Sequence, residues 1–382
     1  MTTAVVGGAL ANKAGYGGEA WVRLSWVSGL RRLGVDTWLV EDIASSTCVD
    51  RNGAPCAPEI SYNRAYFEEV TAAFGLSGRV VLRVDGGRIV FGAGVESLDA
   101  TRDADLVVNI GGHLPAGELF PRAHRAYVDI DPGWTQYWHK TGEPAARLAG
   151  HHTYFSIAEN LGRPGCRIPT GGIDWRPIRQ PVVLADWPVT PGPGVGRYTT
   201  VASWRNGLGP AGDGTFSGKH HEFRGLAPLA RDNDAVHELA LRIHPDDAAD
   251  LDLMTDNGWH IVDPDDVART PDDFRSYVQG SGAECSAAQG VYARTGCGWF
   301  SDRSLRYLAS GRPVLVQDTG LGGAFPVGQG LVTFDSLDSA RAGERRIAGD
   351  YAGHADAARA LAETYFDSTT VLGRFLDEVG VQ

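Results

Sequence analysis

The sequence has few cysteines and no long apolar run. Its 382 residues include five cysteines whose spacings match no zinc-binding pattern: Cys48, Cys56, Cys166, Cys285 and Cys297. Because an odd number cannot pair completely within one chain, we expect free thiols in a reducing compartment and assign none of them to catalysis. No stretch of about 18 uninterrupted apolar residues is present, and the N-terminus lacks the charged start and apolar run of a signal peptide. These absences predict a cytoplasmic protein without a membrane span.

The chain also has little positive charge. Its formal net charge is -12, so the average surface would repel nucleic acid and anionic membranes, and we expect neither as a partner. Lysine occurs at Lys13, Lys140 and Lys219 alone, which makes a lysine beside a predicted ligand site informative. No second dense cluster of carboxylates accompanies Asp129 and Asp131, so we expect no obligatory metal ion. The sequence gives no indication of oligomeric state.

Apolar runs alternate with helical patterns through the first half of the chain. A helix is predicted over residues 21–34, closed by Gly34, and strands are predicted over residues 3–10, 35–42, 103–112, 125–134 and 151–160. Apolar strands separated by helices are typical of a parallel sheet that is covered on both faces.

A second alternation follows a proline-rich segment. It predicts helices over residues 219–230 and 271–281, a helix and a strand within 296–320, helical character over 340–379, and strands over 197–204, 237–244, 257–264 and 283–290. The fold class is therefore α/β, with two doubly wound Rossmann-like domains. The expected boundaries are an N-terminal domain over 1–180, a linker over 181–196, a C-terminal domain over 197–355 and a C-terminal helix over 356–382.

Ligands of open parallel sheets bind beyond the carboxyl ends of the strands, so the loops at those ends are candidate sites. The first such loop contains Gly15, Gly17 and Gly18 ahead of a helix that we expect to begin near Glu19. Glycine lets a backbone come close to a ligand, and it also serves tight turns, so both interpretations remain open. The spacing is not that of the dinucleotide fingerprint.

Two further junctions carry cations. Arg205 lies at the end of a predicted strand, and Lys219 precedes the next helix. The helix dipole and the two cations together favour a diphosphate site here over a loop whose charges are only solvated. Later, Ser301 is a good N-cap, Asp302 suits a first helical turn, and Arg303 could reach an anion at the same helix end. In that case Asp302 would orient Arg303 or bind a ligand hydroxyl. The alternative is an ordinary capped helix with a surface arginine.

The first half offers a candidate for proton transfer. His113 follows a glycine pair at a strand end, and Asp129 and Asp131 end the next predicted strand. A histidine facing a substrate hydroxyl can act as a general base, and a nearby carboxylate can hold its tautomer or replace it. An exposed histidine without a role is the alternative.

Taken together, these features resemble the GT-B superfamily of nucleotide-sugar glycosyltransferases over most of the chain. The segment GCGWFS followed by SLRYLASGRPVLVQD is similar to the donor-binding signature of that superfamily, and SWRN with SGKHHEF is similar to its diphosphate-binding arginine and lysine. The resemblance implies two domains facing a central cleft. It also implies that Arg205 and Lys219 hold the diphosphate, that Ser301 meets a phosphate, and that Gly17 and Gly18 let the first loop approach the donor.

The chain departs from the family pattern at several places. Gly298 and Arg306 stand where one retaining branch has two glutamates, and Gly296 stands where another branch has a histidine. The distance to Gly311 is also two residues longer than in that second branch. These differences leave the sugar, the base and the stereochemical course open, and a retaining reaction would need no base.

The leading hypothesis is a metal-independent glycosyltransferase of the hexosyl-transferring kind. It would need no cofactor, with a UDP or TDP sugar as co-substrate and a small molecule or glycan as acceptor. His113 is the first candidate for the base, and Asp129 or Asp131 would orient or replace it. The alternatives are a catalytically silent GT-B-like binding protein and a sugar-nucleotide epimerase on the same fold. A nicotinamide oxidoreductase ranks lower, although Glu41 lies near the end of the second predicted strand.

Overall fold

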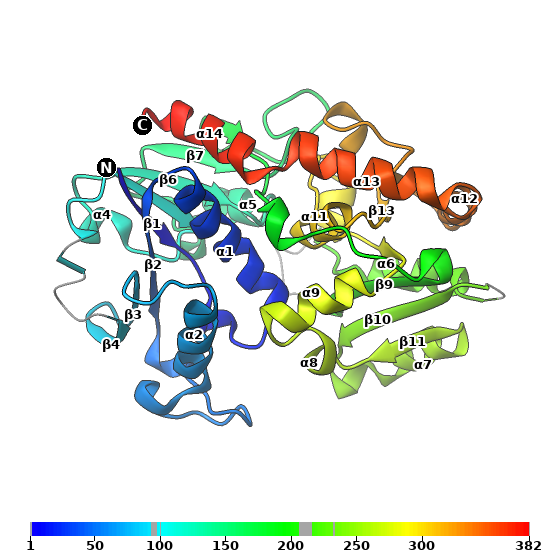
Figure 1. Cartoon of the computed structure of the whole chain (residues 1–382), viewed down its shortest axis with the longest axis horizontal. Helices are drawn as coiled ribbons and strands as arrows, with labels where there is room; N and C mark the ends of the chain where they lie inside the picture. Colours follow the sequence, from blue (N-terminus) through cyan, green and yellow to red (C-terminus); the bar gives the residue numbers. More distant parts are fainter. Residues whose placement is uncertain (1, 93–97, 100, 206–215, 232–233, 382) are drawn as a thin grey trace.

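The computed structural model describes residues 2–92, 98–99, 101–205, 216–231 and 234–381. Strand pairing divides them into two α/β units, each built on its own sheet (Figure 1). This confirms the predicted fold class, because parallel strands alternate with covering helices in both units.

The first unit contains a sheet in the order β4-β3-β2-β1-β5-β6-β7-β8. Every neighbouring pair is parallel except β3 and β4, which form an antiparallel edge. Val5 of the central strand pairs with Trp38 on one side and Val107 on the other, and all three are buried. The strands are β1 (Thr3–Gly7), β2 (Asp36–Ile43), β3 (Val80–Val84), β4 (Arg88–Gly92), β5 (Leu106–Ile110), β6 (His124–Asp129), β7 (Thr153–Ser156) and β8 (Trp175–Pro177).

The second unit contains a fully parallel sheet in the order β11-β10-β9-β12-β13-β14. The order reverses at β9, so β9 and β12 are the strands between which a doubly wound fold opens its ligand crevice. The strands are β9 (Arg197–Ser203), β10 (Val236–Arg242), β11 (Trp259–Val262), β12 (Ala283–Ser286), β13 (Val314–Gln317) and β14 (Leu331–Phe334).

Helices cover both sheets. Those of the first unit are α1 (Gly17–Arg32), α2 (Tyr62–Ala73), α4 (Ala116–Leu119) and α5 (Trp134–Thr141). Those of the second unit and the tail are α6 (Lys219–Leu226), α7 (Ala248–Asp256), α8 (Pro264–Val267), α9 (Pro271–Gln279), α10 (Gly290–Ala293), α11 (Asp302–Ala309), α12 (Leu337–Gly349), α13 (Tyr351–Tyr365) and α14 (Ser368–Val379).

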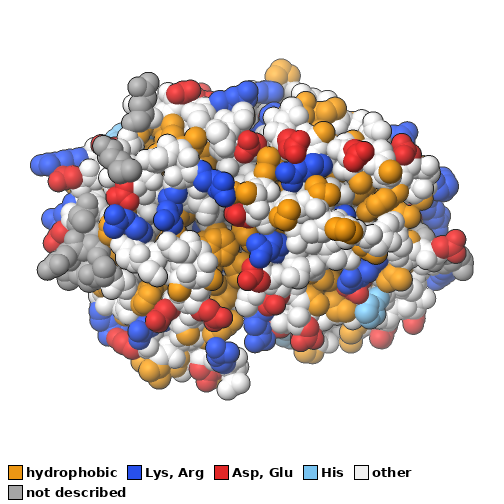
Figure 2. Space-filling model, viewed as in Figure 1, with side chains coloured by type: hydrophobic (Ala, Val, Ile, Leu, Met, Phe, Trp, Pro, Cys, Tyr) orange, Lys and Arg blue, Asp and Glu red, His pale blue; other side chains and the backbone are white. Residues whose placement is uncertain are grey.

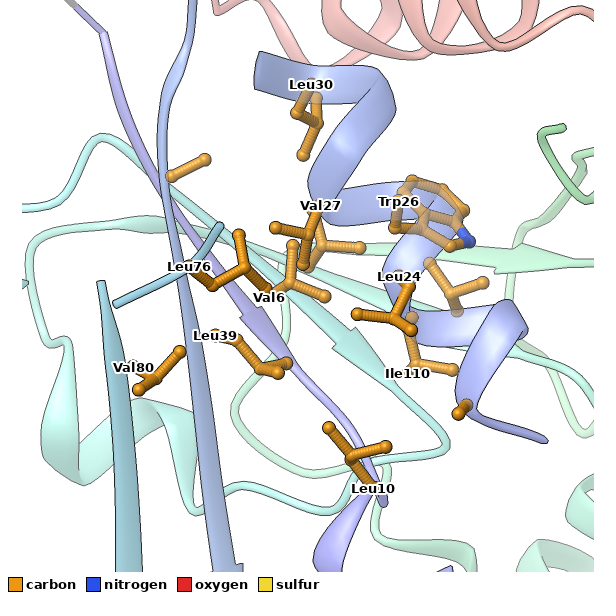
Figure 3. Packing of buried hydrophobic residues seen from close by; sticks show 14 of the residues in the cluster. Val6, Leu10, Leu24, Trp26, Val27, Leu30, Leu39, Leu76, Val80 and Ile110 are labelled. Atoms are coloured by element: carbon orange, nitrogen blue, oxygen red, sulfur yellow. The ribbon is translucent and has the colours of Figure 1, made fainter. Parts of the chain in front are cut away.

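Helix α1 is the main packing element of the first unit. Leu24, Val27 and Leu30 pack over the strands that carry Val6 and Leu39 (Figure 3). The opposite sides of α1 are buried as well, since it contacts α9 of the second unit and α14 of the tail. A helix that is buried on several sides is expected to be apolar all round rather than along one stripe.

The proline-rich segment and the C-terminal tail both join the two units. The predicted linker is not solvated throughout, because Val182 and Trp187 are fully buried in the core beneath α11. Helix α13 packs against α11, whereas α14 returns to the first unit, where the rings of Phe375 and Trp26 are 5.2 Å apart (Figure 1). The two units are therefore tied together by these two segments of the chain.

The surface is mixed in charge on the face shown in Figure 2, where basic and acidic side chains are interspersed. Within the described ranges, no helix is both long enough and apolar enough to cross a bilayer.

Candidate active site

A cavity of about 650 Å³ lies between the two units. Residues beyond the carboxyl ends of β1, β5, β6, β9 and β10 line it, together with the first turns of α1, α6 and α11. Its volume is typical of small-molecule sites, and its position is the one at which parallel sheets bind ligands.

The structure brings nearly all of the predicted site residues together in this cavity. The lining includes Gly17, Gly18, His113, Asp129, Asp131, Lys219, Ser301, Asp302 and Arg303. Arg205 is the exception. Its Nε lies 2.8 Å from both carboxylate oxygens of Asp247, it does not line the cavity, and its side chain is mostly exposed. The predicted pairing of Arg205 with Lys219 is therefore corrected, because Asp247 holds the arginine elsewhere.

Lys219 stands at the first position of α6, where the N-cap is Gly218 and no side chain caps the helix. The ammonium group makes no hydrogen bond or ion pair with any residue in the described part of the chain. Burial, and then the charge of Arg303, lower the pKa of Lys219 to about 7, while Glu284 and Asp302 oppose that shift. An anion in the cavity would restore the charged form, because an opposite charge stabilises it.

The start of α11 forms the neighbouring wall. The side chain of Ser301 accepts a hydrogen bond from the backbone N–H of Arg303 at 3.3 Å, which confirms Ser301 as the N-cap. The Arg303 guanidinium does not point to a free anion site. It donates to Glu284 at 2.5 Å, to the Val201 carbonyl at 3.0 Å and to Ser286 at 2.6 Å. Glu284, rather than Asp302, orients this arginine.

Gly17 and Gly18 serve contacts between the units. A Cβ on Gly17 would lie 2.0 Å from the Thr270 carbonyl oxygen, and the Gly17 N–H already donates to the Ala268 carbonyl at 2.9 Å. A Cβ on Gly18 would lie 3.2 Å from the Phe274 ring. The sequence predicted a close backbone approach here, and the structure shows that the partner is the second unit.

Asp129 is a structural carboxylate. It is fully buried and accepts hydrogen bonds from Thr135, Gln136 and Ser156, each at 2.8 Å. Its Oδ1 also accepts the N–H of Asp131 at 3.1 Å, which fixes the turn that carries Asp131. Both oxygens are thus occupied, and this disfavours the prediction of a catalytic role for Asp129.

Asp131 lines the cavity with its side chain accessible to solvent. The cleft around it is crowded with protein, and this desolvation, with the charges of Glu19 and Asp129, raises the pKa of Asp131 to about 7. The Tyr292 hydroxyl lies beside it, and burial together with the Asp131 charge raises the pKa of Tyr292 well above its usual value. A carboxylate that titrates near neutral pH is suited to taking up a proton.

The surroundings of His113 do not favour the predicted role of a general base. Its Nδ1 lies 2.9 Å from Nη1 of Arg147, and a guanidinium can only donate hydrogen bonds, so Nδ1 must accept. Burial, and then the charges of Arg23, Arg147 and Lys13, lower the pKa of His113 to about 3. The neutral ring therefore has its proton on Nε2. A ring in this state donates a hydrogen bond and is poorly suited to act as a base.

Several residues of the site were not predicted from the sequence. Glu19 and Arg23 form an ion pair one helical turn apart in α1, and this i, i+4 spacing was a signal that could have been used. Lys13 and Arg147 also line the cavity, but Arg147 had no distinguishing local pattern.

Aromatic residues complete the cavity. In the second unit, Trp299 and Tyr292 stack with ring centroids 4.1 Å apart. Trp134 and Trp138 of α5 line the cavity from the first unit. The indole N–H of Trp134 donates to the Gln289 side chain at 3.0 Å, from one unit to the other. Flat apolar faces of this kind suit sugar rings and other cyclic groups.

Comparison with solved structures identifies the architecture. Anabaena Alr3699/HepE in complex with UDP-glucose matches over 100% of both chains with a TM-score of 0.61 and 12% sequence identity. The fold is GT-B. The pneumococcal O-GlcNAc transferase GtfA, in complex with UDP and GlcNAc, matches over 99% of this chain and 98% of its own, with a TM-score of 0.57 and 9% identity.

A third GT-B structure shows the same relationship. AviGT4, a glycosyltransferase involved in avilamycin A biosynthesis, matches over 100% of this chain and 97% of its own, with a TM-score of 0.56 and 15% identity. No protein-family model matches the chain, and no curated protein matches its sequence.

The GT-B frame explains two of the departures noted in the sequence. A Cβ on Gly298, whose φ is +72°, would lie 2.9 Å from the Asn160 side chain of the first unit. The guanidinium of the buried Arg306 donates to the carbonyls of Pro181 and Trp21, each at 3.2 Å. Both positions are thus used for contacts between segments of the fold.

Within the residues that the structure describes, no group of three or more His, Cys, Asp or Glu side chains is placed to hold a metal ion.

Proposed function

We propose that this protein transfers a sugar from a nucleotide diphosphate-sugar to a hydroxyl group of a small-molecule or glycan acceptor, without a metal ion. The observation that carries the proposal is Lys219. Its side chain is half-buried, lines the central cavity of a GT-B fold and has no hydrogen bond or ion pair with the described residues. A diphosphate would supply the missing negative charge.

The helix ends beside Lys219 support the same assignment. The N-termini of α6 and α11 both face the cavity, and unpaired backbone N–H groups with the helix dipole favour an anion there. Because HepE and GtfA have been solved with UDP, we take UDP as the first nucleotide to test.

The proposed reaction breaks the bond between the anomeric carbon and the diphosphate oxygen and forms a bond from that carbon to the acceptor oxygen. Lys219 and the two helix ends stabilise the charge on the departing diphosphate. Asp131 accepts the proton of the acceptor hydroxyl, since its pKa of about 7 lies close to the operating pH. The partly exposed Trp299, which stacks on the buried Tyr292, provides a face for a sugar ring.

The experiment combines binding with turnover. A thermal-shift panel of nucleoside diphosphates and their sugar conjugates identifies the donor, because a ligand of the folded state raises the melting temperature. Nucleotide release is then measured with candidate acceptors for the wild type and for Asp131→Asn. Asp256→Asn is the matched control, since Asp256 is an exposed aspartate of α7 that does not line the cavity.

We expect Asp131→Asn to lower kcat by about 10² to 10⁴, the range of a general base, with donor affinity within about twofold. The control should retain both. If no nucleotide shifts the melting temperature, the transferase proposal fails. If a nucleotide binds and Asp131→Asn has normal turnover, the proton is accepted elsewhere.

A further inference from the structure

The wall of the cavity contributed by the first unit has a group of donors that the transfer reaction proposed above does not use. Lys13 lies at the end of a short 3-10 helix after β1, His113 follows β5, and Arg147 follows the loop after α5. All three line the cavity. We refer to Lys13, His113 and Arg147 as the donor triad.

The hydrogen bond between Arg147 and His113 determines which donor groups of the triad can reach a ligand. Arg147 donates from Nη1 to Nδ1 of His113, so the histidine proton is on Nε2. Nε2 makes no hydrogen bond within the described part of the chain, and the ring lines the cavity. The remaining guanidinium nitrogens of Arg147 and the ammonium of Lys13 likewise make no ion pair with any described residue.

No described carboxylate forms an ion pair with the triad. Glu19 is paired with Arg23 instead. Asp129 accepts hydrogen bonds from Thr135, Gln136 and Ser156, and Asp131 forms no ion pair with any described residue. Lys13 and Arg147 therefore remain available to an anionic ligand in the cavity.

The backbone holds the triad in place. Arg147 has φ +48°, an unusual value for a residue other than glycine, and the loop before it is anchored by a bond from the Tyr127 hydroxyl to the Ala146 carbonyl at 3.1 Å. A Cβ on Gly112 would lie 2.8 Å from the Arg147 Cβ, so the loop that carries His113 packs directly on this arginine.

A separate set of hydrogen bonds fixes the backbone before Lys13. The Glu41 carboxylate accepts the backbone N–H groups of Leu10 at 2.8 Å, Ala11 at 2.7 Å and Asn12 at 2.8 Å. These three bonds fix the turn immediately before Lys13.

We propose that the donor triad binds a carboxylate, so that the substrate of this protein includes an acidic sugar or another hydroxy acid. The hydrogen-bonded guanidinium of Arg147 and imidazole N–H of His113 offer donors side by side to the two oxygens of a carboxylate, and the ammonium of Lys13 adds positive charge from the same cavity lining. The inference rests on the proposed function, and it adds a substrate class to it. The carboxylate can belong to the transferred sugar or to the acceptor, since both occupy this cavity.

Two binding experiments distinguish these sources. Calorimetry compares UDP-glucuronate with UDP-glucose for the donor, and free glucuronate with free glucose, each with and without saturating UDP, for the acceptor. Each comparison is made for the wild type, for Arg147→Gln and for Arg163→Gln. Arg163 is a matched control because it is an exposed arginine outside the cavity lining. Arg147 is exposed as well, so its variant should fold, and circular dichroism checks this.

We expect the acidic ligand to bind about tenfold more tightly than the neutral one in one of the two comparisons, the effect of one charge-assisted hydrogen bond. Arg147→Gln should abolish that preference and Arg163→Gln should keep it. Preference in the first comparison assigns the carboxylate to the donor, and preference in the second assigns it to the acceptor.

The inference is overturned if UDP binds and neither comparison favours the acidic ligand, or if the preference persists in Arg147→Gln. Failure of the proposed function is a different result, namely no binding of UDP at all. In that case an Arg147-dependent binding of glucuronate without UDP would still support the carboxylate site.

Discussion

Replacement of Lys219 by alanine is the sharpest test of the donor site. The ammonium lies at the N-terminus of α6 with no partner among the described residues, so its charge is available to a diphosphate. Loss of a hydrogen bond to a charged group costs about 1.5–3 kcal/mol, which corresponds to a Kd about 10- to 150-fold higher. UDP-glucose is the appropriate ligand, because its diphosphate does not titrate near neutral pH.

The pKa of Lys219 adds a second signature. Burial and Arg303 lower this pKa to about 7, so the free protein loses the ammonium charge as the pH rises above that value. A bound diphosphate stabilises the ammonium and raises its pKa, and binding must then include uptake of a proton. The Kd of the wild type should therefore be lowest below pH 7 and should rise by up to about tenfold per pH unit above it.

Isothermal titration calorimetry at several pH values measures both effects. Lys219→Ala should bind more weakly below pH 7 and lose the part of the pH dependence that Lys219 supplies. The pKa of Asp131 in the same cavity is also raised to about 7, so the protein with Lys219 and the Lys219→Ala variant are compared with Asp131→Asn present in both. Lys140→Ala is the matched control, because Lys140 is an exposed lysine in the last turn of α5 and does not line the cavity. A Kd of Lys219→Ala within about twofold of the wild type at pH 6.5, or an unchanged pH dependence, would refute the assignment of Lys219 to the diphosphate.

Three further outcomes test the structural argument. Gly17→Ala should lower the free energy of unfolding, because its Cβ would lie 2.0 Å from a carbonyl oxygen of the second unit. Gly373→Ala in α14 has open space around its Cβ and should raise the free energy of unfolding by up to about 1 kcal/mol. Thermal denaturation compares the two variants, and equal stabilities would contradict the close packing at Gly17. Arg205→Ala should leave the Kd for UDP-glucose unchanged, since Asp247 holds its guanidinium outside the cavity; a tenfold weaker Kd would return Arg205 to the donor site. Removal of divalent ions with a chelator should leave turnover intact, and a loss that magnesium restores would show that the reaction needs a metal.

The local patterns predicted many of the elements because short apolar runs are enough to mark buried strands. The runs before His113 and before Arg205 correspond to β5 and β9, and the helix predicted from Lys219 begins at that residue as α6. Helix α1 begins at Gly17, earlier than predicted, because the first turn is stabilised by the second unit through the Ala268 carbonyl. Strands β3, β4, β8 and β14 were not predicted. The antiparallel edge strand β4 is only partly buried and lacks a strong apolar signal, and β8 and β14 are three and four residues long. Strand β3 is buried throughout, but Arg83 interrupts its apolar run.

The roles of the charged residues were harder to predict. Position along the chain placed His113 and Asp131 at strand ends, where the structure finds them. The tautomer of His113 depends on Arg147, which lies 34 residues away, and the orientation of Arg303 depends on Glu284, which lies 19 residues away. Neither partner is marked by a local pattern.

The sequence by itself thus determined the α/β class, the two parallel sheets and the loops that form the cleft, because burial imposes a periodicity on each segment independently of the others. Only the tertiary structure decided which ionisable groups are free to meet a ligand. Asp129, Arg205 and Arg303 are each occupied by partners from other segments, whereas Lys219 has none among the described residues. The reason is physical: a charge pairs with whichever group the fold brings within hydrogen-bonding distance, and its pKa follows from that environment.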